Sequence, residues 1–426
     1  MIDRILKALK NNNVSIYRLR DTVTESTEVF FVKKKLDTRR IANTETVSVT
    51  VYREFEKDGV KFLGDANFSV EPSMSEEIID SKIKKAFMSA GFVTNKAYDL
   101  AEKLVSDVVE VESNIADIPV DEALGKMVEA LYRNDTDSNT FINSAELFLT
   151  KHKSRVMTGN GVDVAWIQYG VNGEYVCQCK TPEDVETYAS FDYDNLECEQ
   201  LAEKVKETLA MTRDRSVAVA NPVNGKADIV LPNRYAEEVL NYYLVQTDAF
   251  YNFAGYFENK VGSFVQGKEE EISGDRITMD LLPVAPFNGD GIKMIERSGI
   301  EKGVMKTYQG ALRFCRYLNV PAVGAYSKYR IASGDMSFED MKKQKGLYIV
   351  NFSDFQLDPV VGCFRGEIRL AYYNDGEKIV PVTGGSVNGS IIEAQKSIRL
   401  SKERQETTTI SGPKAILLKD VSVAGC

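Results

Sequence analysis

The pattern of apolar and polar residues divides the first half of the chain into blocks of strands and helices. Glu45–Phe55 alternates with a period of two, and Val60–Val70 follows after the turn Lys57-Asp58-Gly59, which predicts an antiparallel pair. Apolar residues at helical spacing predict helices over about 2–9, 75–91, 95–107, 119–131 and 195–211. Further strands are predicted over 15–20, 28–33, 140–150, 154–158, 162–169 and 174–180.

The second half has a different pattern. Ala220–Lys226 is rich in Asn, Pro and Gly, so we place the main boundary there. Beyond it the chain becomes β-rich, with a helix near Asn233 and short helices over about 309–317 and 391–398. We therefore predict an α+β protein with an N-terminal region over 1–220, divisible into about 1–115 and 116–220, and a C-terminal domain over 221–426. The first region is expected to hold a mixed antiparallel sheet with helices, and the second to have few helices.

Charge and composition exclude several classes of protein. The 426 residues carry a net charge of −10, which disfavours nonspecific binding to nucleic acid. No apolar stretch approaches the roughly 18 residues of a membrane span. Six cysteines are too few for a disulfide framework, which predicts reduced thiols and a cytoplasmic protein. Together with the charge and the absence of an apolar span, this predicts a protein that binds neither membrane nor nucleic acid.

Few residues suggest chemistry by themselves. Cys177 and Cys179 share one face of a predicted strand, but no second pair or histidine cluster completes a zinc site. His152 is the chain's one histidine, and its two lysine neighbours should lower its pKa. A dyad of His152 with a distant thiol remains open. The segment 384–389 before a predicted helix is a weak phosphate-loop signal, better explained as a turn.

Ordered segments of the second half resemble the TldD/PmbA family, whose PmbA branch is also called TldE. A glycine-rich hairpin is followed by a short helix, a strand, a Gly-Cys-Phe segment and a closing pair of strands. These segments are 288–306, 311–319, 337–350, 359–367, 381–393 and 417–425. Val361 and Arg365 depart from the family pattern. The likeness covers about residues 227–426, whereas residues 1–220 fit the family in layout more than in motif.

This resemblance implies a peptidase system that is also associated with the name "modulator of DNA gyrase". In TldD-type members a His-Glu-x-x-x-His helix and a C-terminal cysteine hold zinc, which activates water. The corresponding helix here, about 234–246, contains no histidine, and its acids Glu237 and Glu238 are interpreted as ordinary surface acids. The segment Arg404–Ser411 contains no cysteine, and Cys426 lies beyond it, so we assign no metal ligand or catalytic residue.

The resemblance therefore favours a non-catalytic PmbA/TldE-like subunit of a zinc-dependent protease acting on peptides or unfolded proteins. We expect no cofactor in this chain, zinc only in a TldD-type partner, and pairing with that partner or with itself as a dimer. The aromatic residues that could line a peptide chamber, or instead form core, are Tyr242, Tyr243, Phe250, Tyr251 and Phe253. The alternatives are a stand-alone homodimeric peptidase with a noncanonical site and a homo-oligomeric binding or scaffold protein.

Overall fold

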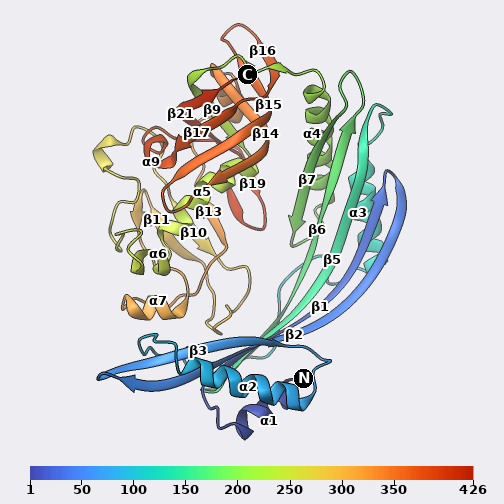
Figure 1. Ribbon diagram of the computed structural model, residues 1–426. Coiled ribbons are helices and arrows are strands. Elements are labelled where there is room, and N and C mark those ends of the chain that lie inside the picture. The colour runs from blue at the N-terminus through green and yellow to red at the C-terminus, as the bar shows by residue number, and fades with distance from the viewer. Residues whose placement is uncertain (426) are drawn as a thin grey trace.

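The computed structural model describes residues 1–425 and shows three sheets with helices packed around them (Figure 1). The first sheet has the strand order β3-β2-β1-β5-β6-β4, with β7 also paired to β6. Its strands are β1 Tyr17–Val32, β2 Lys35–Lys57, β3 Val60–Val70, β4 Val109–Glu110, β5 Thr140–Thr158, β6 Asp163–Cys179 and β7 Val185–Tyr193. Neighbouring strands are antiparallel except β4 and β6, so the sheet is mixed, as predicted.

Two further sheets lie in the second half. The second sheet has the order β12-β11-β10-β13-β20-β19, and the third contains β14-β9-β21-β17-β15-β16-β8, with β18 paired to β21. Strands of the second sheet are β10 Met279–Leu282, β11 Arg297–Glu301, β12 Val304–Met305, β13 Lys328–Ile331, β19 Arg404–Glu406 and β20 Ile410–Pro413. Strands of the third are β8 Val219–Ala220, β9 Gly225–Pro232, β14 Gly346–Leu357, β15 Cys363–Asn374, β16 Ile379–Thr383, β17 Ser386–Ser390, β18 Arg399–Leu400 and β21 Ala415–Ala424.

The longer helices belong mainly to the first half, and those of the second half are short apart from α5. The helices are α1 Ile2–Asn11, α2 Glu76–Ala90, α3 Val120–Tyr132, α4 Cys198–Arg215, α5 Arg234–Gln246, α6 Ala249–Phe253, α7 Leu312–Tyr317, α8 Phe338–Lys342 and α9 Ile391–Ala394, with a 3-10 turn η1 at Glu269–Glu271. The α+β class and the β-rich second half are confirmed. The division into domains near residue 220 stays a prediction; β8 at this position pairs with β16 of the third sheet. Among the described residues, no helix is long and apolar enough to span a bilayer.

The predicted helix over 95–107 is wrong. This segment is extended and lies against the first sheet, where the amide of Leu63 donates to the carbonyl of Asn95 and the amide of Asp163 donates to that of Leu104. Pairing with the sheet satisfies the backbone groups that a helix would have satisfied internally. Local helical spacing was therefore overridden by tertiary contacts.

Other boundaries also differ from the predicted ones. Residues predicted as pairs of short strands form the continuous strands β1, β5 and β6, because each polar interval continues the ladder with its neighbours. The helix predicted over 391–398 ends at Ala394, and the segment before it forms β17 rather than a loop leading directly into the helix.

Candidate functional site

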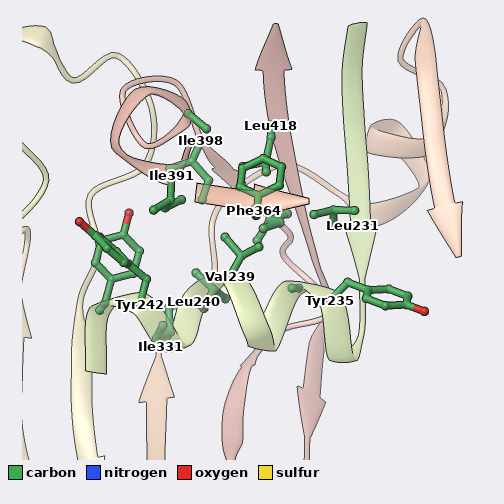
Figure 2. Packing of buried hydrophobic residues seen from close by; sticks show 14 of the residues in the cluster. Leu231, Tyr235, Val239, Leu240, Tyr242, Ile331, Phe364, Ile391, Ile398 and Leu418 are labelled. Atoms are coloured by element: carbon green, nitrogen blue, oxygen red, sulfur yellow. The ribbon is translucent and has the colours of Figure 1, made fainter. Parts of the chain in front are cut away.

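Helix α5 stands at the centre of the second half. Its buried face is formed by Tyr235, Ala236, Val239, Leu240 and Tyr243, a spacing that keeps one helical stripe against the sheets. Figure 2 shows Val239 and Leu240 between Phe364 and Leu418 of the third sheet and Ile331 of the second. This packing fixes the position of the opposite, polar stripe of the helix.

The polar stripe carries two half-buried carboxylates. Glu237 accepts a hydrogen bond from Thr407 Oγ1 at 3.2 Å, and Glu238 accepts one from the amide of Leu357 at 3.0 Å. Burial raises the pKa of both carboxyls. They are therefore not the freely solvated helix-face acids that the sequence suggested.

A lysine from the first half faces this stripe. Burial lowers the pKa of Lys204 on α4, and the nearby Arg234 cation lowers it further, although the side chain remains accessible to solvent. The Glu237 charge acts in the opposite direction on Lys204. A half-buried carboxyl group and an amine that act on each other through charge provide polar groups for binding a ligand.

Three contacts connect α4 and β7 to the β19–β20 hairpin beside α5 and to Lys414, the residue that follows β20. Gln200 donates to the carbonyl of Glu406 at 3.0 Å, Thr408 donates to Asp192 at 3.0 Å, and Lys414 lies 3.3 Å from Glu207. The candidate site, defined here as Lys204, Arg234, Glu237, Glu238 and Thr407, thus lies where the first half of the chain meets the second.

The candidate site does not suit zinc. Glu237 and Thr407 bring together the helix and the C-terminal segment in which the family resemblance places zinc ligands. In this chain they contribute a carboxylate and a hydroxyl, and the carboxylates are already engaged in protein hydrogen bonds. Within residues 1–425 no three His, Cys, Asp or Glu side chains are grouped to hold a metal ion, and Cys426 lies outside the described residues.

The five aromatic residues singled out from the sequence occupy two environments. Tyr242 and Tyr243 are buried beside α5, and burial raises the pKa of Tyr242 to about 12. The Tyr243 hydroxyl donates to Gln395 Oε1 at 3.2 Å. Phe250 and Phe253 are exposed, and their rings lie 4.9 and 5.6 Å from that of Phe314 on α7. Tyr251 is half-buried between Phe250 and Phe257.

His152 lies on β5, where its Nδ1 is 3.0 Å from Thr24 Oγ1 and burial lowers its pKa. The lowered pKa is as expected, but its cause is burial rather than the flanking lysines. Gln168 is opposite His152 on β6, and Cys177 lies nine residues further along that strand, about 30 Å away. Burial raises the pKa of Cys177 to about 12 and that of Cys315 to about 11, which disfavours their reactive thiolates.

Sequence reasoning missed Lys204 and Thr407. Each belongs to an unremarkable pattern, an amphipathic helix and a Thr-rich turn, and only the fold brings them beside α5. The one sequence feature that could have indicated Lys204 is its position on the helix nearest the boundary between the two halves.

Solved structures with this fold cover nearly the whole chain. A protein of Bacteroides thetaiotaomicron, described as a proposed modulator of DNA gyrase, has a TM-score of 0.77 at 15% identity, covering 100% of this chain and 98% of that one. A similarly described protein of Thermotoga maritima has a TM-score of 0.76 at 16% identity, covering 99% of both chains. TldE from Thermococcus kodakarensis has a TM-score of 0.74 at 15% identity, covering 99% of this chain and 100% of that one.

The sequence gives the family. Residues 224–425 match the family model described as the PmbA/TldA metallopeptidase C-terminal domain. The C-terminal half of the chain therefore belongs to the TldD/PmbA family, and the resemblance inferred from the sequence is confirmed there. A relative in Methanocaldococcus jannaschii, the uncharacterized protein MJ0231, is 24% identical over 301 residues, or 65% of this chain and 68% of that protein.

Proposed function

We propose that this chain is a PmbA/TldE-like, non-catalytic subunit of a zinc-dependent protease that acts on peptides or unfolded proteins. The observation that carries the proposal is the contact between Glu237 and Thr407. It occupies the meeting point of two segments that in TldD-type members supply zinc ligands, and it offers no imidazole or thiolate. The proposal places zinc in a TldD-type partner, with this chain helping to enclose the substrate.

The exposed aromatic residues support a role in contacting polypeptide. Phe250 and Phe253 are 40% and 46% exposed, although both belong to an aromatic cluster with α7. Aromatic rings at a surface contribute strongly to protein contacts. In the proposed complex these residues, with Tyr251, line the wall of the chamber that receives the peptide.

The first test is to isolate the chain from its native cells at low salt and identify what co-purifies. We expect a stoichiometric protein that carries His-Glu-x-x-x-His and zinc, and we expect the pair to degrade an unfolded protein. Recovery of a homo-oligomer alone, even with excess lysate, would contradict the proposal.

Activity of the isolated chain tests the alternative of a stand-alone peptidase. Under the proposed function, the chain without its partner cleaves no peptide. A turnover that disappears in Lys204→Met or Glu237→Gln, but persists in His152→Gln, would instead assign catalysis to the candidate site. Loss in His152→Gln and in one cysteine variant would support the thiol alternative.

A further inference from the structure

The first sheet has one long edge without a partner strand. Residues Lys35–Thr46 of β2 pair with β1 on one side, whereas β3 covers the other side of β2 only over Val47–Lys57. In the part of the chain that the structure describes, no strand pairs with the remaining side of Lys35–Thr46, which we call the open edge. At about 3.3 Å per residue the open edge is about 40 Å long. In Figure 1 it belongs to the outer hairpin of the large curved sheet.

None of the side chains of the open edge is buried. Two are large and apolar: Ile41 is 73% exposed and Leu36 is 48% exposed. Arg39 donates to Asp121 on α3 at 2.5 Å, which places Arg39, and Ile41 two residues further on, at the helix-covered face of the sheet. A strand added at the open edge would cover this apolar surface as well as the free backbone groups.

Exposed edges are usually shortened, covered or interrupted, because they attract other strands. The open edge contains no proline and no glycine, so its backbone can accept a partner over most of its length. Two features protect it: its charge, and an irregularity at Asp37, where the β1–β2 register shifts between Phe30 and Phe31. That charge also defines what the edge can bind.

The charge at the open edge is opposite in sign to that of the whole chain. The open edge contains three basic and two acidic residues, a net charge of +1, and the turn residues Lys33 and Lys34 beside it raise the local charge over residues 33–46 to +3, in a chain of −10. Arg39 pairs with the exposed Asp121, and an ion pair of this kind holds its partner weakly, whereas Arg40 pairs with the buried Glu28. A second copy would bring the same basic segment against itself, and like charges across strands are unfavourable. Charge complementarity therefore favours an acidic occupant.

We propose that the open edge of β2 binds an extended, acidic segment of a partner protein by strand addition. Main-chain hydrogen bonds provide affinity, alternate apolar residues cover Ile41 and Leu36 on one face, and acidic residues meet Lys35 and Arg40 on the other. The proposal goes beyond the proposed function, because it requires neither zinc nor the candidate site on α5. An experiment that contradicts the proposed function therefore does not contradict strand addition at the open edge, and the reverse also holds.

The test uses the full chain and a fluorescent ten-residue peptide in which valine and glutamate alternate. We expect saturable binding by fluorescence anisotropy with a Kd below about 1 mM. A peptide of the same composition with its valines and glutamates in separate blocks, and an alternating valine–lysine peptide, should bind at least about tenfold more weakly, which is 1.4 kcal/mol. Hydrogen exchange should show new amide protection confined to residues 35–46.

Matched variants locate the contact. Lys35 lies on the face opposite Ile41, where the glutamates of the peptide would lie. Lys35→Glu should therefore weaken binding severalfold, whereas Lys61→Glu makes the same change of charge on the paired β2–β3 hairpin and should have little effect. Ile41→Ser should weaken binding without changing charge. Unchanged emission of Trp166 shows that each variant is folded.

Three outcomes overturn the proposal: no saturable binding up to about 1 mM, equal binding of the block peptide, or protection outside residues 35–46. Light scattering tests a fourth outcome that would overturn the proposal. A dimer of the chain alone that dissociates in Ile41→Ser would show that a second copy occupies the open edge.

Discussion

At the scale of single residues, the candidate site is defined by carboxyl and amino groups with shifted pKa values rather than by any motif. Glu237 and Lys204 belong to different halves of the chain, and burial shifts their pKa values in opposite directions, each toward the neutral form. Neither shift follows from neighbours in the sequence. Both arise because the fold brings α4, α5 and the Thr407 turn together.

Glu237→Gln should change how the stability of the protein depends on pH. The folded protein raises the pKa of Glu237 above its ordinary value, so this group contributes stability at low pH and loses it as pH rises through the folded pKa. Glutamine keeps an acceptor for Thr407 without the charge. Urea unfolding should therefore show the variant gaining stability relative to the unmodified protein between pH 4 and pH 7. The control is Glu258→Gln, which changes an exposed glutamate. If the difference in unfolding free energy between Glu237→Gln and the unmodified protein were the same at pH 4 and at pH 7, the raised pKa of Glu237 would be contradicted.

At the scale of elements, the sequence predicted those whose periodicity and packing agree. The period of two in Glu45–Phe55 and the turn at Asp58-Gly59 correspond to β2, β3 and their hairpin, in which both turn residues have positive φ. The helix expected over 95–107 failed because its backbone pairs with the sheet. For the site, the sequence indicated helix α5 through the family resemblance. Lys204 and Thr407 could not be found, since their partners lie more than 30 residues away in the sequence.

The buried stripe of α5 should account for much of the stability of the second half. Leu240 has no exposed surface, so Leu240→Ala should lower the free energy of unfolding by about 2–5 kcal/mol through lost burial and the cavity left behind. Asn241→Ala changes the next, half-buried position of the same helix and should stay within about 0.5 kcal/mol. Urea unfolding followed by circular dichroism measures both. A loss below about 1 kcal/mol for Leu240→Ala would show that α5 packs loosely.

At the scale of the whole molecule, the two halves share a small apolar cluster beside an ion pair. Trp166 on β6 is buried, and its ring lies 6.2 Å from that of Phe287 in the second half. Near this cluster, Arg18 on β1 forms an ion pair with Asp290, and Arg20 lies 3.6 Å from the same carboxylate. The two arginines come from the first half and the aspartate from the glycine-rich hairpin that carries part of the family resemblance. This contact, together with the candidate site, fixes how the curved sheet faces the C-terminal half.

Asp290→Ala should therefore loosen the contact between the halves before it unfolds either of them. Removing the carboxylate leaves Arg18 and Arg20 adjacent without compensation, at a cost of about 1–3 kcal/mol, between the values for exposed and buried pairs. Because Trp166 is the one tryptophan, its emission reports on this contact. In urea, the tryptophan emission of Asp290→Ala should change at a lower urea concentration than the circular dichroism does. The control is Glu301→Gln, which breaks an exposed ion pair with Lys306 and should leave both transitions at their original urea concentrations. Coincident transitions in Asp290→Ala, at the unmodified midpoint, would show that this ion pair does not contribute to holding the halves together.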